Sequence, residues 1–325
     1  MSFLPNNIEL LSKTCRSFFI STLCYKKNIM IMNKIWFITG SSRGLGRSLT
    51  EVILEQGGKV AATARTPQQL NDLVEKYPDQ LLTLKLDVSN ESEVKKAVEE
   101  TIAHFGKIDV VVNNAGFGIT GAAEAFTHEQ IDSQITTNLY GPIYVTRAVL
   151  PYLRKQRSGH ILQISSIGGR VGGPGLSIYQ AAKFGLAGFS ESVSKEIAPL
   201  GIRLTIVEPG GFRTDWAGAS MTYAENIEDY NSTVGWVSTV LKGADFQPMG
   251  DPIKAARVMI NLVEDPQPPL HLVLGSEAAG LLQQAEAARK AEFEKWLPVT
   301  VSTDHDDAVN FLETEAGKRL AGLNN

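Results

Sequence analysis

Residues 35–46 read IWFITGSSRGLG, and this stretch decides the fold. Its first four residues form a short apolar run, which predicts a buried strand. Glycines follow at Gly40, Gly44 and Gly46, and from Leu45 onward apolar residues recur at helical spacing. The pattern therefore predicts a strand, a tight turn and a helix. A glycine turn at a helix N-terminus lets free backbone amides approach a pyrophosphate.

The alternation of strand and helix continues along the chain. Further apolar runs predict strands at residues 60–62, 81–84, 108–112, 160–164, 203–207 and 270–274. Apolar residues at helical spacing predict helices at 67–77, 91–105, 128–156 and 179–198, with a bend at Gly141-Pro142 in the third of these. Continuous apolar strands between helices are typical of a parallel sheet covered on both faces. We therefore expect an α/β fold, a doubly wound parallel sheet of the Rossmann type in a single domain.

Other segments surround or interrupt this pattern. Residues 1–32 are basic and poor in acids, and we expect a poorly ordered extension, with a targeting segment or an upstream start as alternatives. The domain is expected at 33–300 and a polar, acidic tail at 301–325. Within the domain, residues 212–250 lack clear periodicity. This segment contains Trp216, Met221, Tyr223, Tyr230, Trp236 and Phe246. Because ligands bind at the carboxyl ends of parallel strands, we expect a substrate lid here, the alternative being a hydrophobic cluster without a ligand.

Composition excludes several classes of function. Of 325 residues, 31 are Lys or Arg and 35 are Asp or Glu, for a net charge of -4, and no long block of one sign occurs. We therefore expect no nucleic-acid partner and no membrane partner. Both cysteines, Cys15 and Cys24, precede the first strand, and the histidines are too scattered for a local metal-ligand pair. We expect no metal site and, by default, a cytoplasmic location.

The end of the second strand indicates which dinucleotide is bound. NAD sites usually present an acid there, about twenty residues after the glycines. No acid occurs between Lys59 and Asn71, whereas Arg65 stands at the strand end and Arg43 lies in the glycine turn. Two guanidinium groups can flank a 2′-phosphate, so we expect NADP(H) rather than NAD(H). The alternative is that both are solvated surface side chains.

A second pattern concerns proton transfer. Tyr179 stands four residues before Lys183, and Ser166 lies thirteen positions before the tyrosine. One helical turn places the phenol and the ammonium on the same face, where the cation favours the phenolate and lowers the tyrosine pKa. Alone, so short a motif more often marks an ordinary surface helix. Its place in a chain with a dinucleotide-binding pattern indicates a proton donor.

In the order and spacing of these motifs, residues 34–275 resemble the classical short-chain dehydrogenase/reductase family. The resemblance implies that the cofactor is bound by Gly40, Ser42, Arg43, Gly44, Leu45, Gly46, Arg65, Asp87, Val88, Asn114, Ala115, Gly116, Pro209, Gly210 and Thr214, together with Tyr179 and Lys183. It implies a catalytic tetrad of Asn138, Ser166, Tyr179 and Lys183. Asp87 and Val88 would lie beside the adenine, and Pro209, Gly210 and Thr214 on the nicotinamide side.

The resemblance also implies a reaction, the reduction of a ketone or aldehyde to an alcohol or the reverse. Tyr179 would give the proton, and Lys183 would lower its pKa and hold the nicotinamide ribose. Ser166 would hydrogen-bond the substrate oxygen, and Asn138 would position a water in a proton relay. Ser165 competes for the serine role, but the family spacing to the tyrosine favours Ser166.

Two other functions stay open. One is a non-catalytic NADP(H)-binding sensor, although such proteins usually lack the tyrosine or the lysine. The other is an epimerase or dehydratase of the extended branch, whose glycine spacing, Gly-x-x-Gly-x-x-Gly, differs from the one found here. The aromatic residues at 212–250 favour a moderately apolar carbonyl or alcohol substrate, and the resemblance implies a homodimer or homotetramer. Neither the particular substrate nor the physiological direction follows from the sequence.

Overall fold

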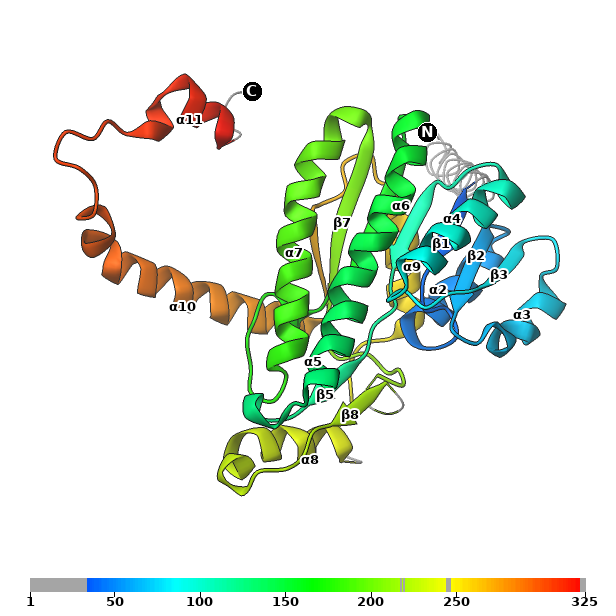
Figure 1. The fold of residues 1–325 in the computed structure, drawn as a ribbon, viewed down its shortest axis with the longest axis horizontal. Helices are drawn as coiled ribbons and strands as arrows, with labels where there is room; N and C mark the ends of the chain where they lie inside the picture. The colour runs from blue at the N-terminus through cyan, green and yellow to red at the C-terminus, as the bar shows by residue number, and fades with distance from the viewer. Residues whose placement is uncertain (1–33, 217, 219, 244–246, 322–325) are drawn as a thin grey trace, which may run out of the picture. The chain divides into compact units, whose positions relative to one another are not determined.

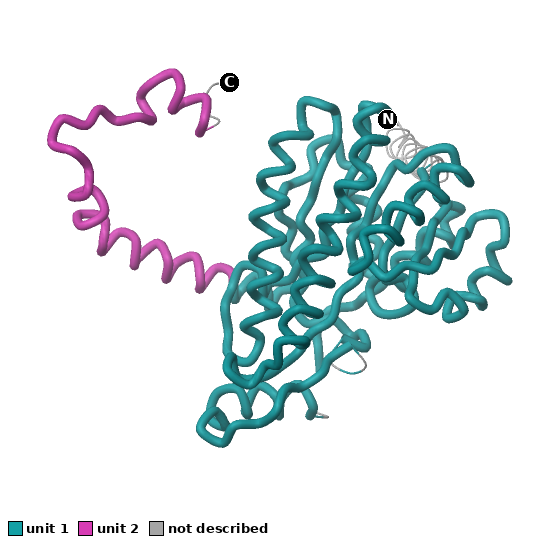
Figure 2. Tube along the Cα trace, in the orientation of Figure 1, with its two compact units in different colours: residues 1–281 teal, residues 282–325 magenta. Residues whose placement is uncertain are grey.

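The computed structural model describes residues 34–216, 218, 220–243 and 247–321. The expected extension at 1–32 and Phe246 of the aromatic segment lie outside these residues. The chain divides into two compact units, residues 1–281 and 282–325 (Figure 2). The division falls earlier than residue 300, where the sequence pattern places the end of the domain.

The centre of the first unit is a seven-stranded sheet with the order β3-β2-β1-β4-β6-β7-β9. Its strands are β1 (Ile35–Ile38), β2 (Lys59–Ala64), β3 (Leu81–Lys85), β4 (Val110–Asn113), β6 (Gly159–Ile164), β7 (Ile202–Pro209) and β9 (His271–Leu274). Every neighbouring pair runs parallel. All seven expected strands are present, and the doubly wound α/β fold is confirmed. The strand order reverses between β1 and β4, which is where such sheets open a crevice for a ligand.

Helices cover both faces of this sheet (Figure 1). One face carries α2 (Gly44–Glu55), α3 (Asn71–Lys76) and α9 (Pro252–Glu264), and the other carries α4 (Glu91–Phe105), α6 (Gly141–Gln156) and α7 (Ser177–Ile197). Successive residues of β1 enter opposite cores, since Trp36 and Ile38 pack on the α2 side and Phe37 on the α4 side. This two-sided burial explains why the strands read as continuous apolar runs.

The expected helix at 128–156 is two helices joined by a wider turn. α5 (His128–Ile135) begins at a capping box between Thr127 and Gln130, and a π-helical turn at Thr136–Tyr140 precedes α6. The interruption falls just before the expected bend because Pro142 has no N–H to donate to the carbonyl four residues earlier. That carbonyl belongs to Asn138, so the irregular turn presents one of the candidate catalytic residues.

The aromatic segment at 212–250 contains regular structure that its sequence pattern does not indicate. β8 (Met221–Tyr223) pairs in parallel with β5 (Gly118–Thr120), and α8 (Trp236–Lys242) follows. This small sheet joins the chain after β7 to the chain after β4, although the paired strands are about a hundred residues apart in the sequence. The aromatic segment is thereby anchored beside the carboxyl ends of the central strands.

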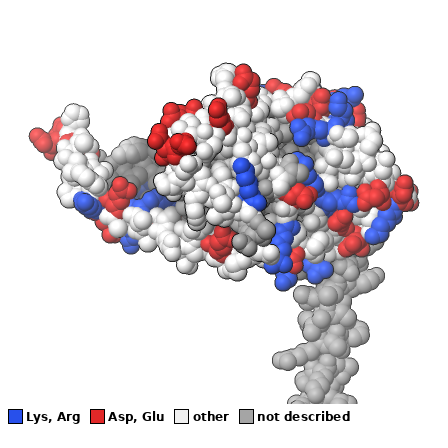
Figure 3. Space-filling model, turned by 90° about the horizontal axis from the view of Figure 1, so that it is seen from below, with Lys and Arg blue, Asp and Glu red and all other residues white. Residues whose placement is uncertain are grey.

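Two further helices follow β9. α10 (Ser276–Val301) starts in the first unit, and the second unit contains its remainder and α11 (Glu315–Leu320), which Thr314 caps. None of the helices among the described residues combines the length and apolar character needed to cross a membrane. Seen from below, acidic and basic side chains lie interspersed over the molecule rather than in one field of a single sign (Figure 3).

Candidate active site

A cleft of about 1330 Å³ lies at the carboxyl ends of the central strands. Its lining includes the residues that follow β1, β2, β3, β4, β6 and β7, and it reaches Thr222 and Leu241 of the lid segment. Every candidate site residue named from the sequence lines this cleft except Gly46, which lies behind the wall. The structure therefore brings the candidate cofactor and catalytic residues into one space.

Two glycines of the turn, Gly40 and Gly46, have no room for a side chain. Gly40 has a φ of +69°, and a Cβ there would lie 2.9 Å from the Cα of Ala115. A Cβ on Gly46 would lie 2.3 Å from Nδ2 of Asn114. That amide donates to the carbonyl oxygens of Thr39 and Gly40, at 2.9 and 3.0 Å, and so fastens the turn to the end of β4. The turn is held for close approach of a ligand to backbone.

The first turn of α2 suits an anion. It contains no acidic residue, and Arg43 at the N-cap makes no capping hydrogen bond through its side chain. Its backbone N–H groups are therefore left for a ligand, and the helix dipole favours negative charge there. These features fit a dinucleotide pyrophosphate.

Arg43 and Arg65 stand exposed at the rim of the cleft. Among the described residues, neither guanidinium is engaged by a carboxylate. Arg47, one turn further along α2, differs because it forms ion pairs with Glu51 and Asp72. Its pKa is raised, mainly by the hydrogen bond to Asp72. Arg43 and Arg65 thus keep their donors for a ligand, whereas Arg47 is committed to the fold.

The turn after β3 forms another part of the wall. Oδ1 of Asp87 accepts hydrogen bonds from the N–H and the hydroxyl of Ser89, at 2.9 and 2.6 Å. Val88 packs against α6, where a Cβ on Gly141 would lie 2.8 Å from its Cγ2. The geometry holds both predicted adenine-side residues in place at the cleft.

Ser166, Tyr179 and Lys183 meet in the cleft beyond the central strands. Tyr179 and Lys183 are one turn apart on α7 and only 6% and 4% exposed. Nζ of Lys183 donates to the carbonyl oxygen of Ile164 at 2.8 Å and lies 5.7 Å from the centre of the Tyr179 ring. The ammonium is thus anchored to the end of β6, beside the phenol.

Burial sets the pKa values of this pair. It raises the pKa of Tyr179 to about 12, against a smaller lowering by the Ser166 hydroxyl, and it lowers the pKa of Lys183 to about 8. The tyrosine pKa therefore lies above its usual value, opposite to the net direction expected from the Tyr179/Lys183 spacing, because desolvation disfavours the phenolate. Tyr179 is a neutral phenol, able to donate its proton, throughout the neutral pH range.

The two neighbouring serines face different surroundings. Oγ of Ser166 accepts from the N–H of Gly168 at 3.0 Å and lies close enough to Tyr179 to affect its pKa. Oγ of Ser165 is buried without a hydrogen-bond partner among the described residues, and a Cβ on Gly169 would lie 2.7 Å from it. Ser166 is thus the serine beside the phenol.

Asn138 is fully buried, and its side chain is engaged at both ends. Nδ2 donates to the carbonyl oxygen of Phe117 at 2.9 Å, and Oδ1 accepts from the N–H of Phe117 at 3.2 Å. A Cβ on Gly116 would lie 2.6 Å from that Oδ1 and 3.8 Å from Nζ of Lys183. Asn138 therefore fixes the backbone after β4 in the layer behind the lysine, and Phe117 is a site residue that the sequence pattern missed.

The loop after β7 closes the other side of the cleft. The N–H of Gly210 donates to Leu274 at 2.9 Å, which ties the Pro209-Gly210 pair to β9. Thr214 lies beside the glycine turn, since a Cβ on Gly44 would lie 3.7 Å from the Cβ of Thr214. The loop after β7 and the glycine turn are therefore neighbours.

Trp216 is the lid residue closest to the chemistry. Its ring meets the Tyr179 ring edge to face, with centres 5.6 Å apart. Phe212 lines the same cleft, whereas Tyr223, Tyr230 and Trp236 line a separate hollow of about 520 Å³. Tyr223, Tyr230 and Trp236 thus lie away from the cleft that holds the candidate catalytic residues. The position of Trp216, two residues after Thr214, is the sequence feature that could have singled it out.

This arrangement can donate a proton to an oxygen atom held between Ser166 and Tyr179. The described residues contain no group of three or more His, Cys, Asp or Glu side chains that could hold a metal ion. The Ser166 hydroxyl and the Tyr179 phenol are two donors that line this part of the cleft.

Comparisons with known proteins agree with this fold. Residues 34–223 match the family model described as short chain dehydrogenase. The chain is 44% identical to Oxidoreductase BOA17 of Botryotinia fuckeliana, over 84% of this chain and all of that protein. It is 41% identical to the 3-ketodihydrosphingosine reductase of Bacteroides thetaiotaomicron, over 56% of this chain and 65% of that one. A solved short-chain dehydrogenase from Streptomyces avermitilis superposes with a TM-score of 0.79 at 36% identity, covering 83% of this chain and 98% of that chain.

Proposed function

Because the chain belongs to the short-chain dehydrogenase family of oxidoreductases, we propose that it is an NADP(H)-dependent enzyme that reduces a ketone or aldehyde to an alcohol, or catalyses the reverse. The observation that carries the proposal is the meeting of Ser166, Tyr179 and Lys183 in one cleft with the glycine turn. A bound dihydronicotinamide would supply the hydride.

Tyr179 and Ser166 act on the substrate oxygen. The raised pKa keeps the Tyr179 phenol protonated, and it gives this proton to the oxygen as negative charge develops there. The Ser166 hydroxyl, held by Gly168, donates a second hydrogen bond to the same oxygen. In the reverse direction the phenol first passes its proton to the relay behind Lys183, and the resulting phenolate takes the proton from the alcohol.

Lys183 and Asn138 support this transfer from behind. An ammonium has three donors, and one of those on Lys183 is used by Ile164, so the others can bind the ribose hydroxyls and a water molecule. The positive charge beside Tyr179 stabilises the phenolate left after proton transfer. Asn138 holds the Phe117 backbone at this place and thereby keeps a path for a proton relay behind the lysine.

Arg43 and Arg65 select the cofactor. Both stand at the rim without a carboxylate partner among the described residues, and no acid between Lys59 and Asn71 competes for a ribose hydroxyl. Their planar donor groups match a 2′-phosphate. We therefore propose NADP(H) over NAD(H).

The substrate class follows from the lid. Trp216 and Phe212 give the cleft an apolar wall beside Tyr179, which favours a moderately apolar carbonyl compound. The similar protein of Bacteroides thetaiotaomicron is named as a reductase of a keto compound, which supports carbonyl reduction as the direction to test first.

A cofactor oxidation assay tests the proposal. The purified chain is mixed with NADPH or NADH and a panel of apolar ketones and aldehydes, and loss of reduced cofactor is followed with product analysis. We expect carbonyl-dependent oxidation that is faster with NADPH. Tight NADPH binding with no turnover of any carbonyl would indicate a sensor, and redox-neutral conversion of a substrate would indicate an epimerase; either result contradicts the proposal.

We also propose that the protein forms a homo-oligomer through α6 and α7. Tyr140, at the start of α6, and Phe184 on α7 are 46% and 42% exposed, although both are large and apolar. Light scattering on the purified chain should report a dimer or tetramer. A monomer at micromolar concentration would contradict this part of the proposal.

A further inference from the structure

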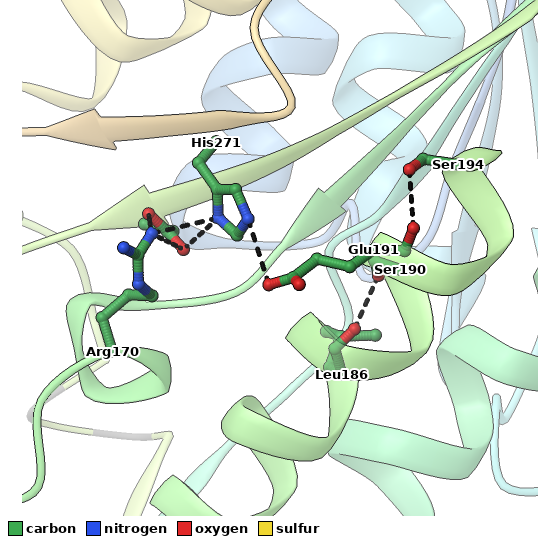
Figure 4. A network of polar contacts seen from close by, with 7 residues as sticks. Arg170, Leu186, Ser190, Glu191, Ser194 and His271 are labelled. Atoms are coloured by element: carbon green, nitrogen blue, oxygen red, sulfur yellow. Dashed lines mark hydrogen bonds and ion pairs between the residues drawn. The ribbon is translucent and has the colours of Figure 1, made fainter. Parts of the chain in front are cut away.

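A fully buried carboxylate lies one residue before the cleft loop. The side chain of Glu208, on β7, has no exposed area. A buried carboxylate is costly unless it is paired. Nη1 of Arg170 lies 3.4 Å from Oε2 of Glu208, and Nδ1 of His271 lies 2.9 Å from Oε1 (Figure 4).

Arg170 connects this carboxylate to the serine turn. Ser166 opens a short turn in which its carbonyl oxygen accepts from Gly169, and the carbonyl oxygen of Ile167 accepts from Arg170, both at 2.9 Å. Arg170 is therefore the last residue of the turn that Ser166 begins. Fixing its guanidinium at Glu208 fixes the turn on which the serine hydroxyl is carried.

Glu208 itself holds the other side of the cleft. It directly precedes Pro209 and Gly210, which line the cleft, and Gly210 is bonded to β9. His271, on β9, is the second partner of the carboxylate. One side chain thus joins the serine turn, β7 and β9 at the point where all three reach the cleft.

The same cluster reaches the catalytic helix. Figure 4 shows His271 between Arg170 and Glu191, and Nε2 of the imidazole lies 3.2 Å from Oε1 of Glu191 on α7. Glu191 is two turns beyond Lys183. Ile206 and Glu208 point to the same side of β7, and Ile206 packs in the core shared with α7. The cluster therefore lies in the layer between the sheet and α7.

We infer that Glu208 is a positioning residue of the reaction, which through Arg170 holds the Ser166 turn at a fixed place relative to the Pro209-Gly210 loop. This inference rests on the proposed function. The substrate oxygen must reach Ser166 and Tyr179 while its carbon faces the nicotinamide side of the cleft, so the separation of these two walls sets the geometry of transfer.

Stability alone does not call for a charge at this position. Glu208 stands among buried apolar residues of β7, and replacing a buried ion pair with apolar side chains is often neutral or stabilising. A second ion pair offers the comparison: the side chain of Glu264, at the end of α9, is 8% exposed and lies 3.5 Å from Nζ of Lys34, which is 22% exposed and stands at the opposite, amino end of β1. The Glu264 pair is remote from the cleft and the Glu208 pair borders it.

The test compares Glu208→Gln, Arg170→Gln and Arg170→Lys with the matched control Glu264→Gln, all in the full chain. For each variant, kcat and KM are measured with NADPH and a carbonyl that the wild type reduces, together with the melting temperature. Amide hydrogen exchange of residues 166–171 is measured without cofactor.

We expect Glu208→Gln and Arg170→Gln to lower kcat about 10- to 100-fold, with little change in the KM for NADPH. Exchange at 166–171 should become faster in both, and Arg170→Lys should recover part of kcat because an ammonium can still pair with Glu208. Glu264→Gln should lower only the melting temperature.

If the Glu208 and Arg170 variants behave like Glu264→Gln, losing melting temperature while kcat and exchange at the serine turn are unchanged, the inference is overturned. If Glu208→Gln does not fold, the Arg170 variants provide the test through the same measurements, because the Arg170 side chain is partly exposed. A wild type without any carbonyl-dependent turnover overturns the proposed function, and the inference with it, whereas an active wild type with unaffected variants overturns the inference alone.

Discussion

The two sides of the cleft, the strand ends and the segment at 212–250, differ in how closely the structure fixes which residues occur there. At the strand ends backbone geometry dictates the residue, since Gly40 and Gly46 leave no room for a Cβ. In the lid, only some of the aromatic residues reach the cleft, and the rest line an outer hollow. We infer from this difference that the sheet positions the proposed cofactor and catalytic residues, while a few side chains of the 212–250 segment select the substrate. Substitutions in the two regions should therefore affect different kinetic constants.

The largest effect is expected from Tyr179→Phe at the strand ends. The change keeps the buried ring and removes the proton donor, so kcat should fall by about 10²- to 10⁴-fold while NADPH binding and melting temperature stay close to wild type. Turnover and NADPH titration measure this. The control is Tyr223→Phe, which alters a tyrosine of the outer hollow and should leave kcat unchanged. A comparable loss of kcat in both variants would contradict the assignment of proton transfer to the strand-end side of the cleft.

The cofactor rim should give the next largest effect. Replacing Arg43 and Arg65 together by Ala should reduce the preference for NADPH over NADH about 100-fold, because each removes charge-assisted hydrogen bonds to the 2′-phosphate. The ratio of kcat/KM for the two cofactors measures the preference. Lys59→Ala, an exposed cation at the other end of β2, should not change it. Equal efficiency of the wild type with both cofactors would disprove the assignment.

Lys183 should make stability depend on pH. Its pKa is lowered from 10.5 to about 8 in the folded state, so between these values the unfolded chain binds more protons and stability rises with pH. The free energy of unfolding of the wild type, minus that of Lys183→Met, should increase by about 2 kcal/mol from pH 8 to pH 10.

Urea unfolding at several pH values measures this difference. Lys195→Met, an exposed lysine on the same helix, should give a difference that is flat with pH. A flat difference for Lys183→Met as well would mean that burial does not lower the pKa of that lysine.

The smallest effect is expected in the lid. Trp216→Ala removes the apolar wall beside Tyr179 and should raise the KM for the carbonyl substrate about tenfold, with the KM for NADPH unchanged. Trp236 on α8 is 64% exposed, and Trp236→Ala should change neither the KM for the carbonyl nor the KM for NADPH. Steady-state kinetics with both substrates varied provide the measurement. A rise in the KM for NADPH but not for the carbonyl would assign Trp216 to the cofactor instead.

The sheet could be predicted because its information is local. Each strand is an apolar run buried on both faces, as in Trp36 to Ile38, and a glycine turn marks the first strand end. Strands that alternate with helices must then run parallel, and their carboxyl ends must converge. That convergence is why Arg43, Ser166 and Tyr179, although distant in the sequence, line one cleft.

The remaining features depend on contacts that no local pattern encodes. β8 exists because it pairs with Gly118–Thr120, and the partners of Glu208 come from a loop and from another strand. The direction of the Tyr179 pKa depends on such contacts too: spacing reveals the neighbouring cation, whereas only the packed structure reveals the burial that raises the pKa.

We propose that this cleft passes a hydride from NADPH to a carbonyl carbon and a proton from Tyr179 to its oxygen. Deuterium transfer tests this proposal: deuterium from NADPH labelled at C4 is followed into the product, for the wild type and for Tyr179→Phe at saturating cofactor. We expect deuterium on the carbinol carbon with the wild type and almost no labelled alcohol with the variant. Labelled alcohol formed equally fast by the variant, or a product without deuterium from the wild type, would contradict it.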